Sequence, residues 1–166
     1  MKPAVSRLHS LTSSWFGGAM RATCLVALLM VSVGCDQPAA LTAEVDVSAT
    51  QTATVGGRAQ LVVVVQNTGP AIAHLGLVFR STDKWYEQHT ITDASGCSVA
   101  TDHSAFDCGD LAAGKTTTFA IAGIAQEAGT FHYELALREL VRPFHYVNNH
   151  ADGADAHTWD EVVRAG

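Results

Sequence analysis

The segment "AQLVVVVQNTGP", Ala59–Pro70, determines the predicted fold class. Five consecutive aliphatic residues, Leu61–Val65, are rich in β-branched valine, which favours a strand. A short continuous apolar run of this kind is typical of a central strand that is covered on both faces. The polar residues Asn67–Pro70 combine Asn, Gly and Pro, which indicates a tight turn. We therefore predict a buried strand that ends at a turn.

Alternation of apolar and polar residues with a period of two continues on both sides of this strand, and no segment after the first 34 residues has a convincing helical period. The alternating segments are "AEVDVSA" (43–49), "AHLGLVFR" (73–80), "TTTFAIAGIA" (116–125), "GTFHYELALREL" (129–140) and "HTWDEVV" (157–163). Glycine and proline turns separate them. The pattern predicts an all-β fold, an antiparallel β-sandwich of seven to eight short strands, formed by residues 43–166.

The first 34 residues are predicted to be a cleaved export signal. Arg21 supplies a positive charge, and Ala22–Val33 is apolar. The apolar stretch is shorter than the roughly 20 residues that a membrane-spanning helix requires. Met20 begins a compact signal by itself, which would make residues 1–19 an overextended start.

Cys35 follows this apolar stretch and resembles the cysteine of a bacterial lipobox. Small residues, Ser32 and Gly34, precede it, although the pattern prefers leucine at the position of Ser32. The resemblance implies that the thiol of Cys35 is acylated after the leader is removed, with residues 35–42 as lipidated cysteine and tether. Ordinary signal cleavage near Ala40 is the alternative.

These features predict an exported, membrane-anchored lipoprotein of the bacterial cell envelope. In many Gram-negative bacteria an aspartate at the position of Asp36 retains a lipoprotein on the periplasmic side of the inner membrane. The residues from Cys35 onward contain seven basic and sixteen acidic residues, a formal net charge of −9. Such an acidic chain lacks the Lys/Arg surface that phosphate contacts require, so we predict that it does not bind nucleic acid.

The remaining cysteines are predicted to form a disulfide bond. Cys24 leaves with the leader and Cys35 takes the lipid, so Cys97 and Cys108 remain as a pair in an oxidising compartment. A redox pair or a metal–thiolate site is the alternative, but the spacing is not CxxC and no neighbouring set of Cys and His partners supports it.

Five motifs occur in order along the domain. They are the glycine turn and apolar strand of Gly56–Val65, "QNTGPAIA" at Gln66–Ala73, "CGDLAAGKTTTFAI" at Cys108–Ile121, "AGTFHYELAL" at Ala128–Leu137, and the pair Asn148 and Asn149. With this order, Glu44–Val163 resembles the bacterial and archaeal "domain of unknown function eleven", an Ig-like repeat of cell-surface proteins. The resemblance implies an Ig-like sandwich without catalytic activity that acts in envelope structure, adhesion or contact with an unknown envelope protein. Members are often tandem repeats, whereas this chain has a single copy.

The C-terminal segment contains the residues that best match metal ligands. Imidazole and carboxylate groups suit Zn²⁺ or Cu²⁺, and the candidates are His145, His150, Asp152, Asp155 and His157. A polar hairpin loop is the alternative, because turns favour Asn, Asp and Gly for backbone reasons. A metal-binding protein of the periplasm or cell surface is therefore the second functional hypothesis, although we predict that the fold needs no cofactor.

Two further groups of residues are candidate sites: three aromatic residues and a contiguous Asp-His-Ser triplet. Trp85, Tyr86 and Trp159 are candidates for partner contact, because aromatic side chains are enriched at interfaces; covering of the core is the alternative. Asp102, His103 and Ser104 are contiguous, and neighbouring side chains of an extended chain point to opposite faces, so they cannot form a catalytic relay. The sequence also lacks GxSxG and HExxH. We predict that the protein is not an enzyme.

Overall fold

The computed structural model describes residues 39–151 and 153–166. The predicted leader, Cys35, Asp36 and Asp152 lie outside these residues. Within them the structure is almost entirely β, as predicted, with twelve strands in three sheets and one single-turn helix. No helix in this part of the chain is long and apolar enough to cross a membrane.

The first large sheet has four antiparallel strands in the order β1-β3-β8-β5. Their bounds are β1 Ala43–Ala49, β3 Arg58–Asn67, β8 Thr116–Ala125 and β5 His89–Asp93. The valine-rich strand β3 is internal: Val63 lies opposite Val47 of β1 and Phe119 of β8. The turn predicted at Asn67–Pro70 is present, and the Asn67 side chain closes it by accepting a hydrogen bond from the Gly69 amide at 3.0 Å.

The second large sheet has six strands in the order β2-β12-β9-β4-β7-β6. Their bounds are β2 Thr52–Thr54, β12 His157–Arg164, β9 Gly129–Glu139, β4 Leu75–Phe79, β7 Ala105–Asp107 and β6 Ser98–Val99. The short β2 pairs with β12 in parallel, whereas the other pairs of this sheet are antiparallel. A small hairpin of β10 (Asn149–His150) and β11 (Gly153–Ala154) forms the third sheet.

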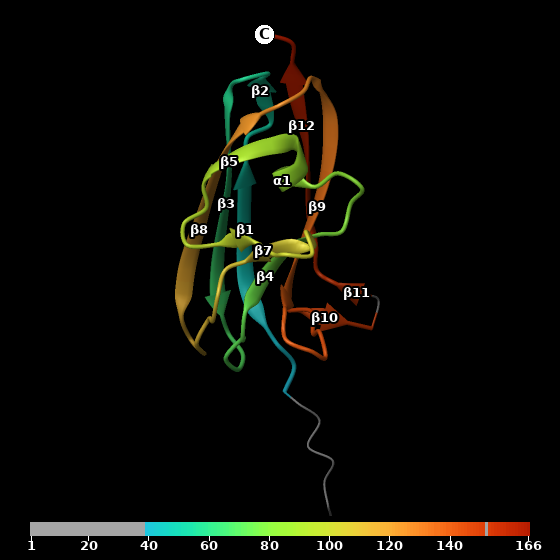
Figure 1. Cartoon of the computed structure of the whole chain (residues 1–166). Helices are drawn as coiled ribbons and strands as arrows, with labels where there is room; N and C mark the ends of the chain where they lie inside the picture. Colours follow the sequence, from blue (N-terminus) through green and yellow to red (C-terminus); the bar gives the residue numbers. More distant parts are fainter. Residues whose placement is uncertain (1–38, 152) are drawn as a thin grey trace, which may run out of the picture. The chain divides into compact units, whose positions relative to one another are not determined.

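The two large sheets contribute their inward faces to one hydrophobic core (Figure 1). Every second residue of each long strand points inward, because side chains alternate across a strand. The buried residues Leu61, Val63 and Val65 of β3 belong to the same core as Tyr133 and Leu135 of β9. The alternation that the sequence predicts for "GTFHYELAL" is therefore confirmed.

The structure departs from the prediction in three respects. It has twelve strands rather than seven or eight, because the five-residue β5 forms in a segment without a clear pattern, and β2, β10 and β11 are pieces of two or three residues outside the alternating segments. A single-turn helix α1, Trp85–Gln88, precedes β5, where no helix was expected. Within residues 39–151 and 153–166, strand β3 is covered on one face only: Val62 and Val64 are half-buried on the outer face of the four-stranded sheet.

Candidate functional site

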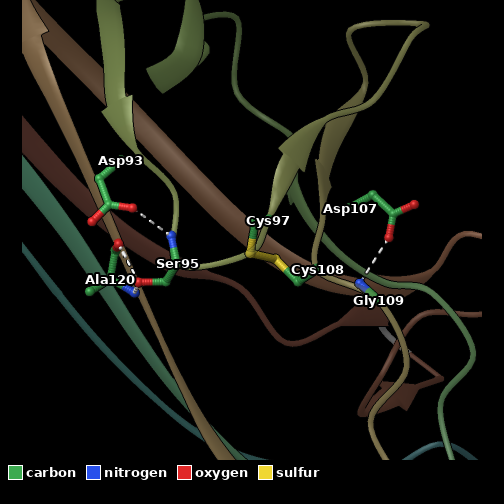
Figure 2. The surroundings of a disulfide bond; sticks show 7 residues. All are labelled: Asp93, Ser95, Cys97, Asp107, Cys108, Gly109 and Ala120. Atoms are coloured by element: carbon green, nitrogen blue, oxygen red, sulfur yellow. Dashed lines mark hydrogen bonds between the residues drawn. A yellow bond between two sulfur atoms is a disulfide. The ribbon is translucent and has the colours of Figure 1, made fainter.

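The predicted disulfide bond between Cys97 and Cys108 is confirmed (Figure 2). Its Cα atoms lie 4.0 Å apart, at the end of the β6–β7 pair, where the two cysteines continue the register of Ser98 opposite Asp107. On the Cys97 side, the Ser95 hydroxyl donates a hydrogen bond to the Ala120 carbonyl of β8 at 2.8 Å. The disulfide bond therefore closes the β6–β7 edge of the six-stranded sheet, close to the hydrogen bond by which Ser95 contacts the four-stranded sheet.

The contiguous Asp102, His103 and Ser104 form a turn, not a relay. The Ser104 amide and hydroxyl both donate to the Asp102 carboxylate, at 3.1 and 2.7 Å. These hydrogen bonds, the one from the hydroxyl first, lower the pKa of Asp102. His103 stands in the left-handed region with φ +52°, as expected for a tight turn. The serine hydroxyl is thus engaged by a carboxylate rather than by an imidazole.

The histidine-rich segment brings together one pair of its candidate ligands. His150 Nε2 lies 3.5 Å from Asp155 Oδ1, and both side chains are exposed. Among the described residues no group of three or more His, Cys, Asp or Glu side chains has the arrangement of a metal site, and Asp152 lies outside them. His145 lies in the loop before the β10–β11 hairpin and His157 begins β12.

We expect the thermal unfolding midpoint of the purified protein to be the same with and without a metal chelator. A structural zinc site normally uses four ligands, and the described part of this segment supplies a pair. Differential scanning calorimetry with and without chelator measures the midpoint. A large fall on chelation that one added ion reverses, and that His150→Ala but not His74→Ala abolishes, would contradict the expectation.

The aromatic candidates for partner contact are mainly core residues, which corrects that prediction. Trp85 is 0% and Tyr86 9% exposed, because α1 places both rings against the core. Tyr86 packs edge-on against Phe106, and its hydroxyl donates to the His103 carbonyl. Trp159 is half-buried and packs against the core cluster. A partner could reach part of the Trp159 ring but not Trp85.

A buried polar pair, which sequence reasoning missed, joins the two large sheets. His89 Nε2 of β5 lies 3.2 Å from Glu161 Oε1 of β12, and both side chains are 0% exposed. His89 Nδ1 lies 3.0 Å from the Trp85 carbonyl oxygen, and the Trp85 ring stacks on the imidazole with centroids 4.2 Å apart. Each side chain has the other as a hydrogen-bond partner, which reduces the cost of its burial.

The alternation of β12 could have revealed Glu161. It shares the inward face with Trp159 and Val163, whereas Thr158 and Asp160 point outward. A glutamate at an inward position requires a buried partner. Strand β8, which pairs with β5, leaves room for the His89 side chain at Gly123, where a Cβ would lie 2.8 Å from the His89 Cβ.

Three polar atoms in and around this pair have no hydrogen-bond partner among the described residues. They are Glu161 Oε2, the Tyr133 hydroxyl and Trp85 Nε1. Burial, and secondly the Glu161 charge, raise the pKa of Tyr133 well above its ordinary value, so its hydroxyl stays protonated. These buried side chains are not accessible to solvent, so we interpret them as part of the core and not as a reaction centre.

The outer face of the four-stranded sheet presents an apolar strip beside a polar row on β1. Val62 and Val64 of β3 are half-buried there. A hollow of about 300 Å³ lies over the β1 side of this face, and its lining residues are Glu44, Val45, Asp46, Val64, Gln66 and Thr116. The face therefore combines a central aliphatic strip with carboxylate and amide groups at its margin, which is the general composition of protein interfaces.

A second surface surrounds the point where the described chain begins. We call residues 140–146 the entry loop. The Asn148 amide donates to the Leu41 carbonyl at 2.8 Å, and the Asn148 side chain exchanges two hydrogen bonds with the Ala43 backbone, at 2.9 and 2.7 Å. These bonds hold the entry loop beside the beginning of β1. A cavity of about 270 Å³ between them is lined by Ala39, Ala40, Leu41, Glu139, Phe144, His145, Tyr146 and Asn149.

Comparisons with known proteins show no family for this chain. No protein-family model and no curated protein matches it. A solved structure of the VesB protease of Vibrio cholerae is similar over 71% of this chain and 31% of that chain, with 20% identity and a TM-score of 0.34. A similarity of that strength carries no argument about activity, and the resemblance to an Ig-like repeat stays a prediction.

Proposed function

We propose that this protein is a lipid-anchored, exported module of the bacterial cell envelope that binds or spaces an envelope protein and has no catalytic activity. The observation that carries the proposal is the short sequence separation between Cys35 and the first strand. Cys35 precedes Ala39, the first described residue, by four positions, and β1 begins at Ala43. The confirmed disulfide bond agrees with an oxidising compartment.

The environment of the histidines supports a non-catalytic role. Four of the described histidines pair with a carboxylate: His74 with Asp107, His89 with Glu161, His132 with Asp160, and His150 with Asp155. The buried pair is closed to substrate. The hydroxyls of Ser81, Ser95 and Ser104 donate to backbone carbonyls or a carboxylate, and none of these three hydroxyls is hydrogen-bonded to a histidine.

The strand order supports the Ig-like expectation in part. In an Ig domain, one sheet has the first, second, fifth and fourth strands and the other has the third, sixth and seventh. The order β1-β3-β8-β5 and the neighbours β12-β9-β4 follow that scheme. The short β6 and β7 depart from it, because they come after β5 in the chain and return to pair beside β4.

Replacing Cys35 with serine is expected to abolish incorporation of a tagged fatty acid, because serine offers no thiol for acylation. Metabolic labelling of cells that produce the full chain, followed by gel fluorescence and membrane fractionation, measures this. Cys24→Ser is the matched control, because Cys24 leaves with the leader, and it should be labelled like the wild type. Equal labelling of Cys35→Ser and wild type would refute the anchor, and so would a mature protein that starts near Ala40.

The outer face of the four-stranded sheet is the proposed site for the protein partner. The sequence of β3 is typical of a strand covered on both faces, but the described residues cover only the inner one. A partner that covers Val62 and Val64 would bury the second face and gain the corresponding hydrophobic free energy.

We expect a photocrosslinking residue at position 64 to give a specific adduct in living cells, and one at position 162 to give none. Val162 is the matched control, because it is an apolar residue, 39% exposed, in the six-stranded sheet. Val64→Lys should weaken the complex while leaving the unfolding midpoint nearly unchanged, because the site is half-exposed. An equal yield at both positions, or none at position 64, would contradict this surface.

A further inference from the structure

We propose that the entry loop docks into the headgroup region of the same membrane that holds the Cys35 anchor, so that the domain stands on the bilayer in one orientation. This inference rests on the proposed function, because it requires the lipid on Cys35. The occupant of the surface is a phospholipid bilayer, and three observations lead to it: the position of the chain entry, the exposed apolar side chains and the unpaired arginines.

The chain entry places the loop within reach of the bilayer. Four residue steps from Cys35 to Ala39 span at most about 14 Å when fully extended. Ala39 and Ala40 line the same cavity as Phe144 and Tyr146, and the Asn148 hydrogen bonds fix this arrangement. The C-terminus and β2 lie at the opposite end of the domain (Figure 1), where the Val55 amide donates to the Arg164 carbonyl.

The tip of the loop exposes apolar side chains that lie outside the hydrophobic core of the described structure. Residues 141–145 are all exposed, and Val141 and Phe144 are each 44% exposed. They are two of the four large apolar residues that are exposed in the described chain, and they are three positions apart on one loop. Backbone contacts hold the base of the loop. The Glu139 amide donates to the His145 carbonyl at 2.8 Å, and Arg138 forms an isolated antiparallel β-bridge with Tyr146.

Arginines flank this apolar tip in a chain that is otherwise strongly acidic. The guanidinium carbon of Arg138 lies 4.6 Å, and that of Arg142 5.2 Å, from the centroid of the Phe144 ring. Within the described residues neither arginine forms an ion pair with a carboxylate. An exposed aromatic ring in contact with two guanidinium groups matches a bilayer surface, where the ring enters the boundary of headgroups and acyl chains and the exposed Arg142 contacts lipid phosphates.

Depth-dependent quenching of tryptophan fluorescence tests the inference. The processed lipoprotein, purified from membranes in detergent, is reconstituted into vesicles of phosphatidylglycerol and phosphatidylethanolamine with or without bromine-labelled acyl chains. Phe144→Trp places a reporter at the loop tip, and Val55→Trp places one at the opposite end. The wild type gives the background of the core residues Trp85 and Trp159.

We expect the Phe144→Trp emission to shift to shorter wavelength on reconstitution and to lose intensity with brominated lipid, while Val55→Trp shows neither change. Mass spectrometry of the same samples reports acylation separately. Acylated protein without quenching at position 144 would overturn the loop contact and leave the anchor standing. Equal quenching at both positions would also overturn it. Absence of the acyl chain would instead refute the proposed function. Crosslinking of position 144 to a protein in cells, without quenching in vesicles, would reject lipid in favour of a protein occupant.

Discussion

Replacing Glu161 with alanine is expected to lower the free energy of unfolding by about 3–5 kcal/mol, because it leaves His89 buried without its partner. The His89 imidazole is 0% exposed and is stacked on Trp85, so neither water nor a rearranged side chain can replace the lost carboxylate easily. The loss would also separate the two sheets at this point, since the pair links β5 of one sheet to β12 of the other. Urea denaturation of the purified protein under oxidising conditions measures the change.

Two further variants make this prediction specific. Glu44→Ala removes an exposed carboxylate of β1 and should change the free energy of unfolding by no more than about 0.5 kcal/mol. The joint change His89→Leu and Glu161→Leu should recover most of the stability, because apolar groups of similar volume often replace a buried ion pair without loss. A loss below about 1 kcal/mol for Glu161→Ala would show that the pair contributes little.

Removing the disulfide bond with Cys97→Ala and Cys108→Ala is expected to cost about 3 kcal/mol, the chain-entropy value for so short a loop. The covalent bond restricts the unfolded chain, and in the folded state it closes the β6–β7 edge of the six-stranded sheet. These two strands have only two and three residues, so their pairing has few backbone hydrogen bonds of its own. Urea denaturation again provides the measurement.

The matched control for the disulfide is Ser98→Ala, which changes an exposed β6 residue next to Cys97 and leaves the bond intact. It should behave like the wild type, and adding a reductant should destabilise the wild type but not the double alanine variant. Equal stability of the double variant and the wild type would contradict the expectation. The amount of protein in cells that produce each variant can also be compared, because a protein that unfolds more easily is degraded faster by proteases.

The sequence by itself determined the features that depend on local patterns. Alternation with a period of two places Phe131, Tyr133 and Leu135 on one face of β9, and that face is buried as expected. The disulfide was predicted by counting cysteines, because only Cys97 and Cys108 remain after the predicted leader and the predicted lipidation site are set aside. Turn chemistry similarly predicted the end of β3 at Asn67. For the strand face and the turn a few neighbouring residues contain the physical cause, whereas the disulfide required a count of the cysteines along the whole sequence.

Tertiary structure alone decided which distant residues meet. His89 and Glu161 are 72 positions apart, and Ala43 and Asn148 are 105 apart, so no local pattern links them. Burial of Trp85 and Tyr86 depended on a single turn of helix that is too short to have a detectable period. The sequence likewise did not show whether Val62 and Val64 are covered on the outer face of the sheet. An apolar run indicates that burial is favourable, but it does not identify the surface that buries it. Long-range pairings of this kind are set by the packing of two sheets, in which each strand's position depends on all the others.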